Sequence, residues 1–333
     1  MSNLVKLGIH VLRIGRKNVV RHDLQRFTLG PRGEHNYQFR QARVICSTLM
    51  GSGLADLKQL EFPAILVDEA AQCTEPETLI PICKGGAHVI LSGDHRQLPP
   101  VVFSDDAMQS HLDLSLFERL LWEKVDSVTL DTQYRMHPSI SEFPRLMFYQ
   151  NDCPLFDGVG ITSFKTKIPF PWPAMDVPVC FVHTPAPEER EEGASWTNRP
   201  QARIVASIIQ SLAKAGFPSK AQEGEAIIGV AAPYRAQVDL LRELLPNVEA
   251  LSIDAWQGRE ARLMIVSTVR SNSYQQLGFL RDQRRANVVL TRAQEGLILI
   301  GNKDMLASDG RVWGPWLTQA VAKNLVMEWP CLA

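Results

Sequence analysis

The 333-residue sequence lacks the features that mark several special classes of protein. Its six cysteines are scattered without a Cys-x-x-Cys pair, which argues against a metal cluster or a disulfide framework and favours a reducing compartment. No apolar run approaches membrane-spanning length, and Lys6 and Arg13 interrupt the N-terminal apolar residues, so we expect neither a membrane span nor a secretory signal. The net charge is −1, so a surface that binds nucleic acid would have to be local.

A second absence concerns nucleotide chemistry. The sequence contains no Gly-x-x-x-x-Gly-Lys-Ser/Thr motif and not a single Gly-Lys dipeptide. In nucleotide hydrolases that motif forms a loop whose backbone N–H groups and lysine bind the phosphates. Within these 333 residues, triphosphate binding lacks this main anchor.

Short apolar runs alternate with helical patterns, which predicts an α/β protein with mainly parallel sheets. Strands are predicted at residues 11–14, 44–47, 65–67, 89–91, 125–130, 179–183, 227–231, 251–253, 263–268, 288–290 and 297–300. Helices are predicted at residues 114–122, 198–216 and 236–245. We interpret polar residues 16–37 as a loop or insertion and acidic residues 188–193 as a solvated loop.

Residues 151–178 are rich in proline, glycine and aromatic residues, which is typical of a linker. The strand and helix pattern starts again after them. The sequence therefore predicts a first domain at residues 1–150, a linker at 151–178 and a second domain at 179–333.

Polar residues follow two of the predicted strands in the first half. Asp68 and Glu69 come directly after residues 65–67, and Gly93 and Gln97 follow residues 89–91. Hydrolysis of a phosphoanhydride requires a carboxylate near magnesium and a second group that activates water. An acidic helix cap is an alternative for Asp68-Glu69 alone, but the second strand end favours a nucleotide site.

Further candidates lie later in the chain. Arg135 follows a predicted strand and precedes a proline-marked turn, where a guanidinium can bind phosphate oxygens; an ordinary surface ion pair is the alternative. Gly258 permits close approach of the backbone to a phosphate or sugar, and Glu260 could hold a ribose hydroxyl. A solvated strand-to-helix turn is the alternative for that segment. Arg292 is placed like an arginine finger.

Taken together, these segments resemble the Up-frameshift/senataxin-like branch of superfamily 1 helicases. The resemblance spans nearly the whole chain and is carried by VDEAAQ (67–72), GDHRQLPP (93–100), QYRMHP (133–138), APYRAQ (232–237), SIDAWQGRE (252–260) and NVVLTRA (287–293). It implies two RecA-like domains, the first incomplete at its N-terminus because the family's phosphate loop is not in this sequence. It also implies that ATP and Mg²⁺ bind in a cleft between the domains.

The resemblance assigns roles to individual residues. Asp68 would coordinate Mg²⁺ and Glu69 would activate water, while Gln97 would sense the γ-phosphate. Arg135 and Arg292 would contact that phosphate from the first and the second domain.

Gly258 and Glu260 would lie near the nucleotide. Single-stranded RNA or DNA would cross both domains and move 5′ to 3′. Its contacts or their supporting residues would be Thr48, Asn198, Tyr234 and Ser252.

We therefore expect an ATP-dependent helicase motor, present here without its phosphate loop, that works inside the cell, in the cytoplasm or nucleus. Its partners would be nucleic acid and proteins of RNA metabolism. The alternative is a truncated, non-hydrolysing relative that binds nucleic acid or another protein.

Overall fold

The computed structural model describes residues 1–20, 22–29, 36–58, 60–150, 153–161, 166–191, 193, 195–218 and 226–330. The chain forms two compact units. The first unit comprises Met1–His95 and Pro99–Ser127, and the second comprises Arg96–Leu98 and Val128–Ala333. Three residues that follow strand β5 (His88–Leu91) of the first unit therefore belong to the second.

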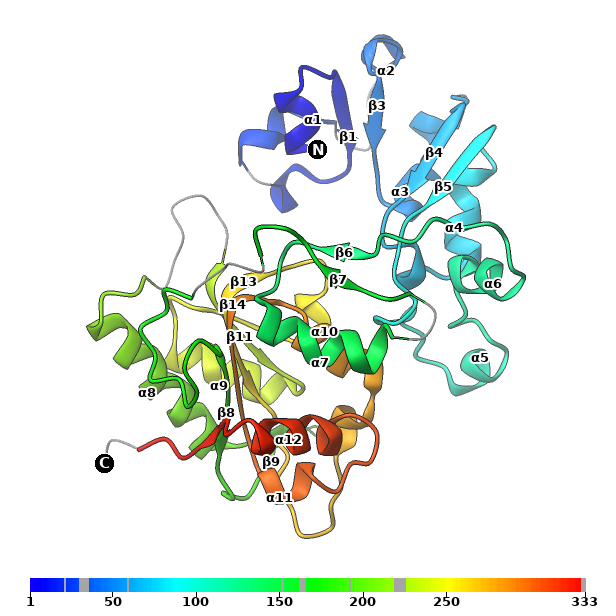
Figure 1. Cartoon of the computed structure of the whole chain (residues 1–333). Helices are drawn as coiled ribbons and strands as arrows, with labels where there is room; N and C mark the ends of the chain where they lie inside the picture. The colour runs from blue at the N-terminus through cyan, green and yellow to red at the C-terminus, as the bar shows by residue number, and fades with distance from the viewer. Residues whose placement is uncertain are drawn as a thin grey trace. The chain divides into compact units, whose positions relative to one another are not determined.

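The first unit contains short helices and short parallel strands (Figure 1). Strands pair in the order β2-β1-β3 and, separately, β4-β5, and every pairing is parallel. The elements are α1 (Ser2–Lys6), β1 (Val11–Ile14), η1 (Lys17–Val19), η2 (His22–Phe27), β2 (Thr28–Leu29), α2 (Asn36–Gln41), β3 (Val44–Cys46), α3 (Leu49–Ser52), η3 (Ala55–Leu57), β4 (Ala64–Val67), η4 (Ala70–Gln72), α4 (Glu75–Ile82), β5 (His88–Leu91), α5 (Asp105–Gln109) and α6 (Leu116–Trp122).

One face of the β4-β5 pair carries exposed apolar side chains. Leu66 and Ile90 are register partners in the two strands, and they are 65% and 55% exposed. Parallel strands are usually covered on both faces, so this exposure is unusual. The main buried cluster of the first unit lies elsewhere, around Leu12, Ile14 and Leu57.

The second unit is built on a six-stranded parallel sheet with the order β12-β11-β13-β14-β8-β15. Its elements are β6 (Thr132–Gln133), α7 (Pro138–Phe148), β7 (Phe156–Asp157), β8 (Val179–His183), β9 (Glu189–Arg190), β10 (Trp196–Thr197), α8 (Arg199–Lys214), β11 (Ala226–Ala232), α9 (Arg235–Leu244), β12 (Glu249–Ser252), η6 (Asp254–Trp256), β13 (Ala261–Ser267), η7 (Gly278–Arg281), α10 (Gln283–Leu290), β14 (Ala293–Gly301), α11 (Lys303–Leu306), α12 (Trp313–Ala322) and β15 (Val326–Met327).

Both faces of this sheet are buried because successive side chains of a strand point to opposite sides. In β8, Val179 and Phe181 pack in one core with residues of α7, α10 and α12, whereas Cys180 and Val182 pack in the other with α8 and α9. Figure 1 shows the two groups of helices around the sheet. This burial on both faces explains why the strands are continuous apolar runs in the sequence.

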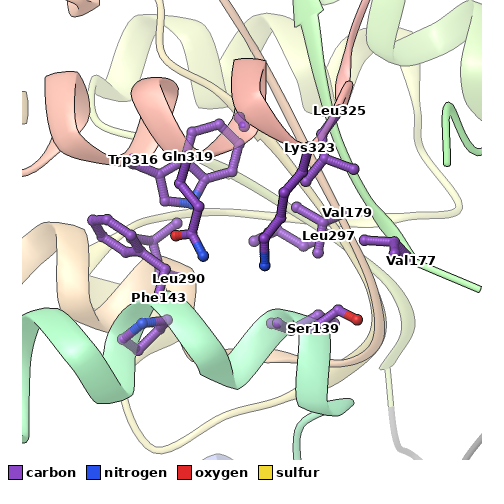
Figure 2. Close-up of a pocket in the computed structure, with 13 residues that line it drawn as sticks. Ser139, Phe143, Val177, Val179, Leu290, Leu297, Trp316, Gln319, Lys323 and Leu325 are labelled. Atoms are coloured by element: carbon purple, nitrogen blue, oxygen red, sulfur yellow. The ribbon is translucent and has the colours of Figure 1, made fainter.

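Helices α7 and α12 border a pocket in the second unit. Figure 2 shows that Phe143 of α7 and Trp316 of α12 line the pocket together with Lys323 and with Val179 and Leu297 of the sheet. The lining is mostly apolar and contains none of the candidate site residues. The pocket is therefore separate from the chemistry that the sequence predicts.

The structure confirms the predicted α/β class with parallel sheets, and most strands lie where the sequence placed them. Two strand predictions are wrong. Residues 125–130 form no strand, and Val128 and Leu130 are almost fully exposed. Residues 288–290 are the end of helix α10, whose N-terminus is capped by the side chain of Asp282. A short apolar run does not distinguish a strand from a buried helix.

The predicted linker also differs from the structure, because its described part packs on the second unit. Ile168 and Phe170 are 4% and 7% exposed and join the core beside α8 and α9. Helix α7, which the sequence placed in the first domain, buries Ile140 and Phe148 in the core of the second unit. Residues 128–178 thus belong with residues 179–333.

The two predicted loops are partly structured. Within residues 16–37, Thr28–Leu29 pairs with β1, while residues 21 and 30–35 lie outside the described part of the chain. Within residues 188–193, the side chain of Glu188 is buried rather than solvated, and Glu189–Arg190 pairs with β10. No described helix has both the length and the apolar character that crossing a membrane requires.

Candidate active site

Asp68 and Glu69 lie in the turn directly after β4. Asp68 is exposed, and its Oδ1 accepts a hydrogen bond from the backbone N–H of Glu69 at 3.1 Å. Glu69 has left-handed backbone angles (φ 53°, ψ 38°), which are unfavourable for a residue with a side chain. Its Oε2 accepts a hydrogen bond from Gln72 Nε2 at 2.7 Å. The turn therefore holds Glu69 in one orientation and leaves Asp68 accessible.

The end of β5 is fastened to the same turn. Ala70 N donates to Ser92 O, and Ser92 N donates to Val67 O, each at 2.8 Å. Gly93 is needed at this point because a Cβ there would lie 2.9 Å from Ala71 N. The two strand ends that the sequence singled out are thus neighbours in the first unit.

Gln97 and Arg292 are brought together in the second unit, although they are 195 residues apart in sequence. Arg292 Nη2 donates to Gln97 Oε1 at 3.2 Å. The arginine is 3% exposed, and it also donates to Val288 O at 3.0 Å and to Thr291 Oγ1 at 2.9 Å. Its guanidinium is therefore held in a defined position, as a group that stabilises developing charge must be.

Arg135 also lies in the second unit, whereas its sequence position predicted the first domain. Its Nη1 donates to Thr291 O at 3.2 Å, and its Nε forms an ion pair with Glu260. Glu260 also accepts a hydrogen bond from Gln294 Nε2 at 2.9 Å. Gly258, two residues earlier, has a left-handed φ of 71° that explains the glycine. The Arg135 guanidinium, which was expected to bind phosphate, is therefore paired with the carboxylate of Glu260.

The four candidates for nucleic-acid contact all take part in local hydrogen bonds. Thr48 caps α3, and Ser252 Oγ accepts from Ala255 N at 3.3 Å. Asn198 is fully buried, caps α8 and donates to Ala186 O and Val269 O. Tyr234 is 5% exposed. Asn198 and Tyr234 therefore support the fold around them, while Thr48 is exposed.

Sequence reasoning missed two features of the second unit. Tyr134 is 69% exposed beside Arg135, and its ring lies so close to Gly158 that a Cβ there would be 2.2 Å from it. An exposed aromatic ring next to an arginine that was predicted to bind phosphate is suited to stack on a base. An aromatic residue next to that arginine was the signal available in the sequence.

The second missed feature is a buried ion pair between Arg270 and Glu188, with Nε and Oε2 2.9 Å apart. The guanidinium lies 4.7 Å from the Trp196 ring centre and donates to Tyr234 Oη at 3.1 Å. Burial lowers the pKa of Arg270, but the bonds to Glu188 and Tyr234 outweigh it and raise that pKa. No sequence pattern links residues 82 positions apart, so only the structure reveals this pair.

Parallel α/β sheets with carboxylates, arginines and a glutamine after their strands are typical of the RecA-like class of nucleotide-dependent motors. Residues 112–304 match a protein-family model described as an AAA domain, and residues 35–105 match a second model with the same description. The first match covers more than half of the chain, so the chain belongs to this AAA-domain family.

Individual relatives identify the branch of the family more specifically. The chain is 38% identical over 318 residues to the regulator of nonsense transcripts 1 homolog of Drosophila melanogaster, covering 92% of this chain and 26% of the relative. It is 37% identical over 343 residues to the ATP-dependent helicase NAM7 of Saccharomyces cerevisiae, covering 98% of this chain and 34% of the relative. These matches confirm the resemblance to the Up-frameshift branch. The chain spans about a quarter to a third of the length of these relatives.

Among solved structures, the Arterivirus nonstructural protein 10 helicase is similar, with a TM-score of 0.45 and 16% identity, over 90% of this chain and 49% of that one.

Proposed function

We propose that this chain carries part of an ATP-dependent helicase motor that moves along single-stranded RNA or DNA. The observation that carries the proposal is the hydrogen bond between Gln97 and Arg292, because the sequence predicted that both residues contact the terminal phosphate. The names of the relatives, which include ATP-dependent helicases, support the same activity.

Asp68 and Glu69 have different roles at the end of β4. Asp68, exposed after β4, would hold Mg²⁺, which neutralises charge on the phosphates when it is bound. A magnesium ion in such sites is bound by one or two carboxylates together with substrate phosphates, so one accessible aspartate fits it. Glu69, oriented by Gln72, accepts a proton from the attacking water.

Arg292, Gln97 and Arg135 act on the terminal phosphate. Arg292 supplies positive charge from a fixed position, and Gln97 orients the phosphate or the water. Arg135 forms its phosphate contact by exchanging the carboxylate of Glu260 for a phosphate oxygen. Glu260 is then available for a sugar hydroxyl near Gly258.

Single-stranded nucleic acid is the proposed track, and protein partners of RNA metabolism are proposed from the names of the relatives. We assign direct contact to Thr48 and Ser252, which are not buried, and a supporting role to Asn198 and Tyr234, which are. The 5′-to-3′ direction follows from the family resemblance. An intracellular location, in the cytoplasm or nucleus, is part of the same proposal.

The test supplies the segments that this sequence does not contain. The NAM7 chimera is the yeast relative NAM7 in which residues 1–333 of this chain replace the matching segment. We expect ATP hydrolysis stimulated by single-stranded RNA or DNA, lost with Glu69→Gln. A folded chimera that binds single-stranded RNA but never hydrolyses ATP would instead support the non-hydrolysing alternative.

A further inference from the structure

Asn287 is a fully buried residue of α10 whose side chain holds a neighbouring segment by its backbone. Its Nδ2 donates to Arg96 O at 3.0 Å and to Tyr149 Oη at 2.8 Å. Both acceptors are in the second unit. An amide placed between a carbonyl and a hydroxyl fixes the course of the chain at residue 96.

The residues on both sides of Gln97 are anchored in the same unit. Arg96 donates through Nη1 to Phe148 O, and its guanidinium lies 6.0 Å from the ring centre of Tyr149. Leu98 is 8% exposed and belongs to the core around Phe181 and Trp316. Gln97 therefore stands between two fixed residues, so its side chain starts from a defined backbone position.

The same helix turn also fixes the partner of Gln97. Thr291 Oγ1 donates to Asn287 O at 2.7 Å, and Arg292 Nη2 donates to Thr291 Oγ1 at 2.9 Å and to Gln97 Oε1 at 3.2 Å. Asn287 thus contacts the backbone that carries Gln97 and the residue that holds Arg292. A shift of Asn287 would move both sides of the pair.

A role in stability alone does not explain this asparagine. Its Oδ1 is buried and has no hydrogen-bond partner among the described residues. A buried polar atom without a partner is unfavourable, and an apolar side chain of similar size would remove that penalty together with the donor to Arg96 O. What the asparagine adds is the donor that reaches Arg96 O.

We propose that Asn287 is a positioning residue for nucleotide hydrolysis, which sets Gln97 and Arg292 at the separation needed to contact one terminal phosphate together. The proposal rests on the proposed function. It extends that function by assigning the geometry of the sensor to a buried residue that acts through its neighbours.

The anchoring is tested by limited digestion of the 333-residue chain with trypsin. Asn287 bonds the carbonyl of the Arg96–Gln97 bond, which trypsin attacks. We expect Asn287→Ala to be cut there at least on the order of tenfold faster than the unaltered chain. Cleavage after exposed Lys124 is the internal reference and should not change. Asn302→Ala, which removes a helix cap elsewhere in the second unit, is the matched control.

The catalytic role is tested in the NAM7 chimera. Asn287→Ala is expected to lower kcat by about tenfold and to change KM for ATP by less than about twofold, because a misplaced group weakens the transition state more than the ground state. Gln97→Ala should lower kcat similarly. The double variant should lose no more than the larger single loss, because the two residues act as one unit. Tyr149→Phe, which leaves Asn287 in place, should lower kcat by about twofold to threefold.

The outcomes separate the two proposals. A folded chimera without ATP hydrolysis overturns the proposed function and, with it, this inference. An active chimera in which Asn287→Ala leaves kcat unchanged, or in which the two losses multiply, overturns the inference alone. If Asn287→Ala does not fold, the kcat of Tyr149→Phe decides, and an unchanged value again overturns the inference.

Discussion

The buried ion pair between Arg270 and Glu188 predicts a large effect on stability. The two side chains are 6% and 5% exposed. Arg270→Ala would leave the carboxylate of Glu188 without its guanidinium, while the backbone N–H of Ser271 and the side chain of Asn272 would still bond it. It would also remove the cation from the ring of Trp196.

Breaking a buried pair by removing one partner costs about 3–5 kcal/mol. The bonds that Glu188 keeps place the expected loss at the lower end of that range, about 3 kcal/mol. For a unit of this size, about 2–4 °C per kcal/mol corresponds to a decrease in Tm of roughly 6–12 °C.

Arg199→Ala is the matched control. Arg199 pairs with Glu189, next to Glu188 in sequence, but both side chains are half exposed. Exposed pairs contribute about 0–1 kcal/mol, so the control should unfold almost like the unaltered chain.

Urea unfolding followed by tryptophan fluorescence suits this comparison, because six of the seven tryptophans lie in the second unit, which also holds Arg270. The midpoint is the relevant quantity, since Trp196 itself contacts the altered residue. If Arg270→Ala and Arg199→Ala lowered the free energy of unfolding equally, the conclusion that the buried Arg270–Glu188 pair stabilises the second unit would be wrong.

Three further predictions concern other residues of the second unit and one cysteine of the first. Gly229→Ala would place a Cβ 2.5 Å from the ring of Trp256, so urea unfolding should show a loss of about 1–3 kcal/mol. Burial raises the pKa of the Cys180 thiol to about 12, so mass spectrometry after iodoacetamide at pH 8 should find exposed Cys83 modified and Cys180 intact. Arg292→Lys in the NAM7 chimera should lower kcat on the order of a hundredfold, measured by phosphate release, because an ammonium cannot reproduce the several bonds of the guanidinium.

The sequence predicted the large sheet well because both of its faces are buried. Strands β8 and β13 contain the apolar runs 179–182 and 263–266, a pattern typical of strands that are buried on both faces. The polar residues that follow β4 and β5 were found for the same reason, since the strand boundaries locate them. Residues 288–290 were wrongly predicted as a strand because the second half of α10 is fully buried and ends in an apolar run of three residues.

The sequence did not predict which of the two units the residues between the main sheets belong to. The proline-rich segment was interpreted as a linker from its composition, but Ile168 and Phe170 are core residues that no local pattern reveals. In the same way, Leu98 and Arg135 follow elements assigned to the first domain, yet long-range contacts place them in the second unit. The pairing of Arg135 with Glu260 also depends on side-chain geometry alone.

The most direct test of the account is the rate of ATP hydrolysis by the NAM7 chimera with and without single-stranded RNA, for the unaltered chain and for Glu69→Gln. The account predicts hydrolysis that RNA stimulates and that Glu69→Gln reduces on the order of a hundredfold or more, since the water loses its base. Hydrolysis that continues unchanged in Glu69→Gln would contradict it.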